Sequence, residues 1–436
     1  MLVRTRRFVG GLTLLAVTLL LAAACVARAD LFTYVNKPDA AYKWELRGVT
    51  DVPNGKIYDL HLVSQVWQGI TWEHQLQVYE PTTVEFPDVM PLYITGGGAG
   101  DDDKALGLTI ANGVGSRVAI LYHIPNQPLF NGLTEDALIS YTWVKYMETG
   151  DEDWICNFAM VKATLRAMDC LQEFAQQQWQ TKLRGFVPLG ASKRGWTTYL
   201  TGIADRERVI AMAPMVFDIL NMPVNVQHQR DFWGAYSPEI ADYTEKGLEQ
   251  MFETGRGFQL FWMVDPYTYR DHLQMPKLVI LGSNDPYWPT DAVNFYWAGL
   301  PSPKLLLIAP NSGHGLNDAA RVLGSIGAYI RLIAQHKPLP VLQGKWDEAP
   351  EGLTLTVKTD TTPIETRVWV ARSPIRDFRP AKWEEAPLPA AGEAFVTTVA
   401  RAEGQYTAAY GEVVFDVDGR RLTCSTQPRV ISPLAK

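Results

Sequence analysis

Cysteine is scarce in this chain, with 4 among 436 residues. Cys25 lies in an apolar N-terminal segment, which leaves three cysteines, and an odd number leaves at least one thiol free or paired between chains. Cys156 and Cys170 share one predicted helix, whose rise of ~1.5 Å per residue puts them ~21 Å apart, too far for a disulfide. The sequence therefore excludes a disulfide-stapled scaffold.

Motifs for metals and nucleotides are missing as well. The sequence has no zinc-ligand spacing, EF-hand loop, Walker loop or dinucleotide fingerprint where one would be expected. Its 7 histidines are scattered along the chain. We therefore expect neither a metal nor a cofactor.

Positive charge is in the minority. The formal net charge is −7, and residues 1–29 contain four arginines and no acid, so their removal would give −7 − 4 = −11. So acidic a chain is not expected to bind nucleic acid or an anionic membrane.

Long apolar runs are confined to the N-terminus. The run at residues 8–24 follows three arginines and precedes the small-residue pattern Ala27-Arg28-Ala29, which is typical of a signal peptide over residues 1–29. We expect export to the periplasm or secretion. An uncleaved anchor is disfavoured because a membrane span needs ~20 residues. A lipid anchor at Cys25 is also disfavoured, because the usual leucine three residues earlier is absent.

Between residues 30 and 338, short apolar runs alternate with segments of helical spacing. This alternation indicates an α/β architecture with a mostly parallel sheet flanked by helices. The predicted strands include residues 56–66, 72–79, 91–95, 117–122 and 209–216, and the predicted helices include residues 135–147, 154–179 and 318–334. Residues 217–275 form an insertion rich in aromatic side chains, which we expect to be a helical cap, with extra core helices as the alternative.

A linker at Pro338-Leu339-Pro340 separates this region from a segment with strand-like alternation. Predicted strands there are residues 353–358, 366–371, 394–399, 405–410 and 412–416. We expect residues 339–436 to form a β-sandwich of the immunoglobulin or fibronectin type. No catalytic candidate lies beyond residue 338, so this domain is expected to bind a protein partner or stabilise the chain without doing chemistry.

A serine stands in a short turn between a predicted strand and a predicted helix, in Gly190-Ala191-Ser192-Lys193-Arg194-Gly195. Small residues permit the sharp, strained turn of a nucleophile elbow, which holds the serine Oγ clear of the sheet. An ordinary turn serine is the alternative. The strand–turn–helix order favours Ser192 as a nucleophile.

Asp285 and His314 each stand just past a later, continuously apolar run. In open α/β sheets, catalytic groups gather beyond the carboxyl ends of the strands, and the order Ser…Asp…His is that of α/β-hydrolases. We predict a triad in which His314 takes the proton of Ser192 and Asp285 orients the imidazole. Asp291 is the competing candidate for the acid. The predicted fold is an α/β-hydrolase fold with a helical cap insertion and a C-terminal all-β sandwich.

Backbone N–H groups are expected to stabilise the oxyanion of acyl transfer. Lys193, which follows the serine, would supply one, and the glycine-rich loop that contains Gly97 and Gly98 would supply the other. Arg194 replaces the glycine of the common G-x-S-x-G motif, and an ion pair within the fold is its alternative role. The candidates for contact with substrate are Arg194, Trp288 and Asp291.

From about Tyr42 onward, the chain resembles the PhoPQ-activated pathogenicity-related family of exported proteins. Its most specific matching motifs are Leu189-Gly190-Ala191-Ser192-Lys193-Arg194-Gly195, Asp265-Pro266-Tyr267-Thr268-Tyr269-Arg270, Leu281-Gly282-Ser283-Asn284-Asp285-Pro286-Tyr287-Trp288 and Pro310-Asn311-Ser312-Gly313-His314. The resemblance implies an exported α/β-hydrolase-like protein, linked in some members to virulence or envelope stress. It also implies the same three triad residues, and it supplies no substrate.

These observations predict an exported serine hydrolase that acts on an ester or amide bond of a small-molecule or peptide substrate. The alternative is a non-catalytic secreted signalling or binding protein that has kept the fold, because a fold does not fix a function. The sequence does not choose between ester and amide.

Overall fold

The computed structural model describes residues 30–251 and 253–434. The predicted signal peptide and the lipid-anchor candidate Cys25 lie outside these residues. Within them, no helix is both long and apolar enough to cross a membrane.

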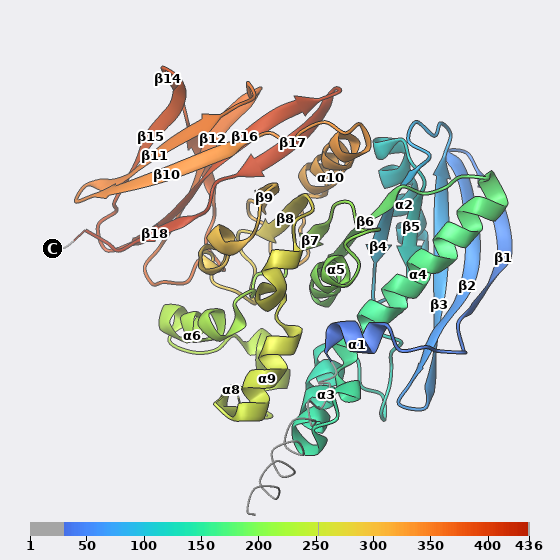
Figure 1. Ribbon diagram of the computed structural model, residues 1–436. Coiled ribbons are helices and arrows are strands. Elements are labelled where there is room, and N and C mark those ends of the chain that lie inside the picture. Colours follow the sequence, from blue (N-terminus) through green and yellow to red (C-terminus); the bar gives the residue numbers. More distant parts are fainter. Residues whose placement is uncertain (1–29, 252, 435–436) are drawn as a thin grey trace, which may run out of the picture.

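A nine-stranded sheet forms the centre of the larger domain (Figure 1). Its order is β1–β2–β3–β5–β4–β6–β7–β8–β9. The three pairs from β1 to β5 are antiparallel, and the pairs from β5 to β9 are parallel. The strands are β1 (Lys43–Val52), β2 (Gly55–Trp67), β3 (Ile70–Pro81), β4 (Val89–Ile94), β5 (Val118–Leu121), β6 (Gly185–Ala191), β7 (Ala213–Met215), β8 (Lys277–Gly282) and β9 (Lys304–Ala309).

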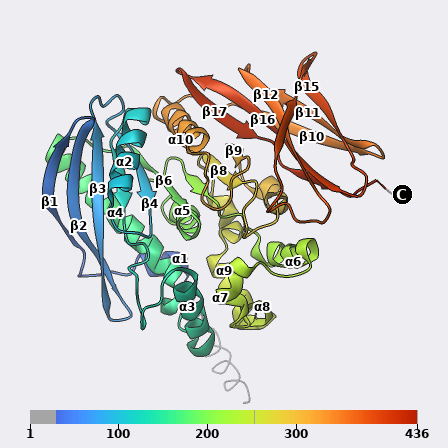
Figure 2. The same cartoon turned by 180° about the vertical axis from the view of Figure 1, so that it is seen from behind.

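Helices cover both faces of this sheet. The long helix α4 (Cys156–Trp179) and α5 (Lys193–Ala204) pack on one face, and α2 (Asp101–Val114) and α10 (Ala319–Ala334) on the other. Figure 2 shows α2 and α10 from behind. Strands buried on both faces explain the continuous apolar runs of β4 to β9. This is the α/β-hydrolase fold.

The insertion of residues 217–275 is helical, and we call it the cap. Its α-helices are α6 (Met222–Trp233), α7 (Ala241–Thr244), α8 (Leu248–Met251) and α9 (Gly255–Val264). Of these, α7 and α9 contact α3 (Glu135–Thr149), and Figure 1 shows α8 and α9 near α3 at the bottom of the view, with α6 further to the left. The insertion therefore lies at the end of the sheet where the parallel strands finish.

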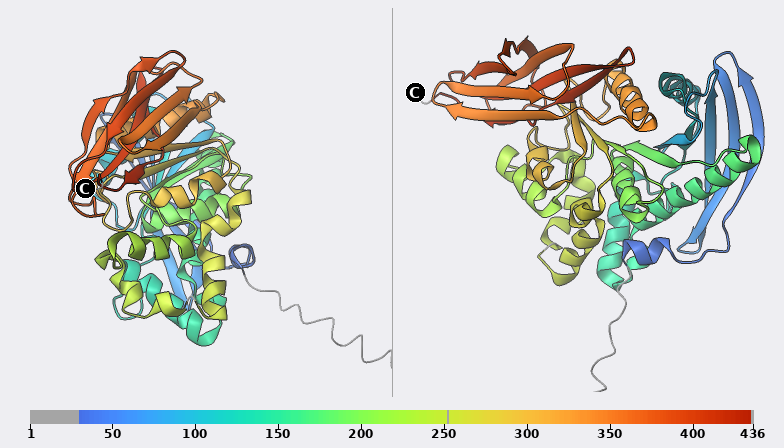
Figure 3. Two further views of the ribbon diagram at one scale, coloured as in Figure 1. Left: turned by 90° about the vertical axis from the view of Figure 1, so that its left-hand side faces the viewer. Right: turned by 45° about the horizontal axis from the view of Figure 1, so that its top comes forward.

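The C-terminal domain consists of two antiparallel sheets. One contains β10 (Leu342–Ala349), β11 (Gly352–Thr359), β14 (Ala390–Ala391) and β15 (Ala394–Ala400). The other contains β12 (Glu365–Ser373), β13 (Glu384–Pro387), β16 (Tyr406–Val417), β17 (Arg420–Ser425) and β18 (Arg429–Ile431). Figure 3 shows this domain against β8, β9 and α10, at the opposite end of the molecule from β1. It covers the β9 edge, where the Ile308 N–H donates to Ser425 Oγ at 2.9 Å.

Two predicted strands differ from the structure. The strand predicted at residues 209–216 is only Ala213–Met215, because Val209 and Met212 form isolated bridges rather than a continuous ladder. The strands predicted at 405–410 and 412–416 are one strand, β16, which runs through Gly411 without a break. A Cβ at Gly411 would lie 2.7 Å from Leu355 Cδ2. The glycine therefore permits close packing of the two sheets rather than a turn.

Candidate active site

Ser192 occupies a sharp turn between β6 and α5. Its φ of 57° and ψ of −125° are strained for a residue with a side chain, and such strain persists where the surroundings enforce it. A Cβ at Gly190 would lie 2.8 Å from the Arg194 carbonyl oxygen, and one at Gly195 would lie 2.6 Å from the Met215 carbonyl oxygen. Glycine at 190 lets the end of β6 close against α5, and glycine at 195 lets α5 pack against β7.

His314 forms a hydrogen-bonded pair with Asp285. The Nδ1–Oδ2 distance is 2.8 Å, and the Asp285 side chain is 8% exposed. The Tyr287 ring packs on the imidazole at 4.2 Å between centroids, with the ring planes tilted by 31°, and the Tyr287 N–H donates to Asp285 Oδ1 at 2.9 Å. Among the described residues, His314 Nε2 is buried and has no hydrogen-bond partner. The ring is thus fixed on one side and available as a base on the other.

A glycine brings the two loops of this pair together. A Cβ at Gly282 would lie 2.5 Å from the carbonyl oxygens of both Ser312 and Gly313. The loop after β8 therefore packs directly on the loop after β9.

Asp291, the competing acid, pairs with a different histidine. His228 Nε2, on α6, lies 2.7 Å from Asp291 Oδ1. The His228 ring packs against Phe232 and Phe295 at 5.3 and 4.4 Å. This second pair connects α6 to the segment that follows β8.

The two cations of the elbow are paired with two acids at the start of α3. The Arg194 guanidinium donates to both oxygens of Glu135 at 2.7 Å and to the Ile124 carbonyl oxygen at 2.5 Å. Lys193 Nζ lies 2.6 Å from Asp136 Oδ2. Burial would raise the pKa of Glu135, but the hydrogen bonds and charge of Arg194 override it and lower the pKa to about 2. Arg194 is therefore held within the fold, as the ion-pair alternative expected.

The glycine-rich loop packs against the same arginine. A Cβ at Gly96 would overlap the Arg194 guanidinium, whereas one at Gly97 would meet nothing within 4 Å. The Gly97 carbonyl oxygen accepts from the His123 N–H at 3.1 Å.

The other predicted oxyanion donor, the backbone N–H of Lys193, lies at the start of α5. Backbone N–H groups in the first turn of a helix have no partner within the helix, and the helix dipole is positive there.

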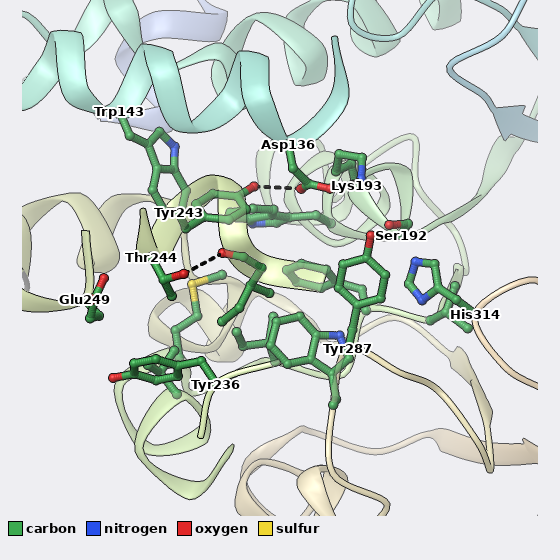
Figure 4. Close-up of a pocket in the computed structure, with 18 of the residues that line it drawn as sticks. Asp136, Trp143, Ser192, Lys193, Tyr236, Tyr243, Thr244, Glu249, Tyr287 and His314 are labelled. Carbon is green, nitrogen blue, oxygen red and sulfur yellow. Dashed lines mark hydrogen bonds and ion pairs between the residues drawn. The ribbon is translucent and has the colours of Figure 1, made fainter. Parts of the chain in front are cut away.

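A cavity opens between the elbow and the cap. Figure 4 shows Ser192, Tyr287 and His314 together at one end, with Tyr236 and Glu249 toward the other. Aromatic and aliphatic side chains form most of its wall, namely Trp143, Trp196, Val216, Phe217, Ile219, Met222, Val226, Tyr236, Ile240, Tyr243, Phe261, Tyr287 and Trp288. The polar lining residues are Ser192, His314, Asp136, Lys193, Thr244 and Glu249. Of the predicted substrate contacts, Trp288 lines the cavity, whereas Arg194 and Asp291 do not, and neither do Gly97 and Gly98 of the glycine-rich loop.

The sequence did not single out Tyr287 or the acids Glu135 and Asp136. Tyr287 follows Asp285 by two positions, a spacing that carries no signal by itself. The two acids meet Arg194 and Lys193 only because α3 folds against the elbow. Tyr243 of the cap also donates to Asp136 Oδ1, at 2.9 Å. Asp136 thus connects the cap to the elbow.

Comparison with known proteins gives relatives in sequence and in structure. Residues 31–379 match the family model described as "PhoPQ-activated pathogenicity-related protein". The "Autocrine proliferation repressor protein A" of Dictyostelium discoideum is 33% identical over 396 residues, which is 84% of this chain and 79% of that protein.

Solved structures with partial similarity include an esterase and a hydrolase. Acetyl xylan esterase 1 from Thermoanaerobacterium sp. JW/SL YS485 has a TM-score of 0.48 and 15% identity, covering 70% of this chain and 93% of that chain. An S-formylglutathione hydrolase from Agrobacterium tumefaciens has a TM-score of 0.45 and 13% identity, covering 67% and 100%. The family predicted from the motifs is confirmed by the sequence match: this chain belongs to the PhoPQ-activated pathogenicity-related protein family.

Proposed function

We propose that this protein is an exported serine hydrolase that cleaves an ester or amide bond with Ser192, His314 and Asp285. The observation that carries the proposal is that Ser192 and His314 line one cavity. His314 is held by Asp285 through Nδ1, and its Nε2 has no hydrogen-bond partner among the described residues. The strained backbone of Ser192 supports it, because strain of this kind clusters at active sites. Export rests on the sequence of residues 1–29, and a role in virulence or envelope stress rests on the family resemblance.

In this proposal, Ser192 Oγ attacks the substrate carbonyl carbon while His314 Nε2 takes the hydroxyl proton. Asp285 keeps the imidazole in the required tautomer and stabilises its charged form. The Lys193 N–H stabilises the oxyanion, and the proton held by His314 passes to the leaving alcohol or amine. Water then hydrolyses the acyl-enzyme with His314 again as base.

The cavity wall favours a substrate whose acyl or side group is apolar or aromatic. Two of the charged residues that line the cavity, Lys193 and Asp136, already pair with each other. The rest of the wall beside them is mostly hydrocarbon and aromatic ring. Burial of each CH₂ group contributes about 0.8 kcal/mol, which is about fourfold in kcat/KM if it is realised in the transition state.

The test is a panel of p-nitrophenyl esters of increasing acyl length beside matched aminoacyl anilides. We expect wild-type turnover that rises from acetate to the longer esters and disappears in Ser192→Ala. Ser64→Ala, in β2, is the matched control, because Ser64 Oγ lies 2.9 Å from a histidine nitrogen, His74 Nε2, and does not line the cavity. Turnover that survives in Ser192→Ala would contradict the proposal.

A second candidate is a secreted signalling protein that does no chemistry. The observation that favours it is the name of the relative, a proliferation repressor. Purified wild-type and Ser192→Ala proteins would be compared for repression of cell proliferation. Equal repression by both, with no turnover in the panel, would favour this candidate.

A further inference from the structure

The loop that joins β12 to β13 in the C-terminal domain reaches the loops that carry Asp285 and His314. We call residues 374–383 the bridging loop. Its last residue is anchored in its own domain, because Trp383 is 1% exposed and its ring lies 5.1 Å from that of Tyr410 on β16. A rigid loop can impose its geometry on what it contacts.

The first contact is made by Asn284, the residue before Asp285. Its Nδ2 amide lies 3.1, 3.1 and 2.7 Å from the carbonyl oxygens of Phe378, Arg379 and Ala381. Its own backbone N–H donates to the Ser312 carbonyl oxygen at 2.9 Å, within the histidine loop. Asn284 therefore ties the acid loop both to the bridging loop and to the histidine loop.

The second contact is made by Asn311, three residues before His314. Its side-chain amide pairs reciprocally with the Trp383 backbone: Nδ2 donates to the carbonyl oxygen at 3.0 Å, and Oδ1 accepts from the N–H at 2.8 Å. Asn311 has a φ of 53°, in the left-handed region that asparagine tolerates better than most residues. The histidine loop thus begins from a turn that the C-terminal domain holds.

The bridging loop also contacts the cap. The Arg379 guanidinium lies over the Trp233 ring of α6 at 4.2 Å and is held by both oxygens of Asp377. The Arg376 guanidinium lies over the Phe232 ring at 4.5 Å. One loop of the second domain therefore touches the acid loop, the histidine loop and the cap.

We infer that the bridging loop is a built-in part of the active site and that Asn284 and Asn311 are positioning residues for the Asp285–His314 pair. This inference rests on the proposed function. It replaces the expectation that the C-terminal domain only binds or stabilises. Because small misplacements of a base cost large factors in rate, release of either amide should lower kcat rather than weaken binding in the cavity.

The experiment compares full-length Asn284→Ala, Asn311→Gly and Asn294→Ala. Glycine at 311 removes the amide without straining the positive φ. Asn294 is the matched control, since its Nδ2 donates to the Pro428 carbonyl oxygen at 2.9 Å and so also joins the two domains, but not through the bridging loop. If Asn284→Ala fails to fold, Asn284→Ser replaces it.

Two readouts are measured on each folded variant: kcat and KM, and the proton resonance of His314 Nδ1–H, assigned by its loss in His314→Gln. We expect the Asn284 and Asn311 variants to lose roughly 10- to 100-fold in kcat with KM within about twofold, and their resonance to shift or vanish. Asn294→Ala should keep wild-type values of both.

Wild-type kcat and resonance in both positioning variants, or equal losses in Asn294→Ala, would overturn the inference. If the wild-type protein turns over no substrate, the proposed function fails. The resonance then still decides whether the bridging loop positions His314.

Discussion

Two aspartate–histidine pairs lie in the described part of the chain, and their local geometry is nearly the same. The Asp285–His314 contact is 2.8 Å and the Asp291–His228 contact is 2.7 Å. Each imidazole also packs closely on an aromatic ring, at 4.2 and 4.4 Å between centroids. A short distance between an acid and a histidine therefore does not identify a catalytic pair.

The second ring nitrogen makes the difference. His314 uses Nδ1 for its acid, and its Nε2 is buried without a partner in the described part of the chain, in a ring that lines the cavity with Ser192. His228 uses Nε2 for its acid and is not among the residues that line that cavity. A base must face the group it deprotonates. We therefore propose that the first pair is the catalytic one and that the second is structural.

The sharpest way to break this comparison is to neutralise each acid in turn. Asp285→Asn should lower kcat by about 10⁴, the size of the loss when the orienting aspartate of a serine protease triad is replaced by asparagine. Asp291→Asn should leave kcat within about tenfold, because it loosens only the junction of α6 with the segment after β8. The measurement is turnover of the best ester of the panel by the two folded variants. The reverse ranking would make Asp291 the catalytic acid.

The aromatic partners give the next largest contrast. Tyr287→Leu should lower kcat roughly 10-fold, because the aromatic ring that packs on the His314 imidazole is lost. Phe295→Leu, the matched change beside His228, should leave kcat close to that of the wild type. Steady-state kinetics on both variants checks this, and equal losses would mean that packing on His314 has no specific role.

The sequence singled out the residues of the first pair but not the residues that surround them. Ser192, Asp285 and His314 could be proposed because each follows an apolar run, and parallel strands present their carboxyl ends on one side of a sheet. The sequence could not decide between Asp285 and Asp291. The two are six positions apart in one loop, and that spacing does not show which side chain points toward His314. His228 lies far away in the chain, and only the folded cap brings it to Asp291.

The β-sandwich was predicted from alternation, but its bridging loop was not. The contacts of Asn284 with residues 378, 379 and 381 join positions about a hundred residues apart, and no local pattern encodes them. The ion pairs of Arg194 and Lys193 with α3 have the same long-range character. The sequence therefore predicted the residues at the strand ends. It did not predict the long-range contacts that join the loops beyond those ends to other parts of the fold.

The packing around the Arg194 ion pair at the elbow can be tested by substituting two neighbouring glycines. Gly96→Ala should destabilise the fold by about 1–3 kcal/mol, because the new methyl group would collide with the Arg194 guanidinium, which Glu135 and Ile124 hold in place. Gly97→Ala should cost less than about 0.5 kcal/mol, since space is open there. Urea unfolding measures both, and equal effects would show that the Arg194 contact is not tight.

The smallest expected effect concerns the pH dependence of the elbow ion pair. The pKa of Glu135 is about 2 in the folded protein against an ordinary 4.5, so its ion pair stabilises the fold above about pH 4.5, and this contribution is lost as the pH falls toward 2. Glu135→Gln should therefore be less stable than the wild type at pH 6, with a gap that narrows at pH 3. Urea unfolding at both pH values checks this, with Glu148→Gln as an exposed control. A gap independent of pH would contradict the assignment.

The central claim is that Ser192, and no other serine, is activated by His314. Its most direct measurement is labelling of the folded, full-length protein with a fluorophosphonate, followed by mass spectrometry of the peptides. The account predicts one adduct, on the peptide that contains Ser192, which is absent in Ser192→Ala and strongly slowed in His314→Gln. Labelling that persists in Ser192→Ala at the wild-type rate, or no labelling of the wild-type protein, would contradict it.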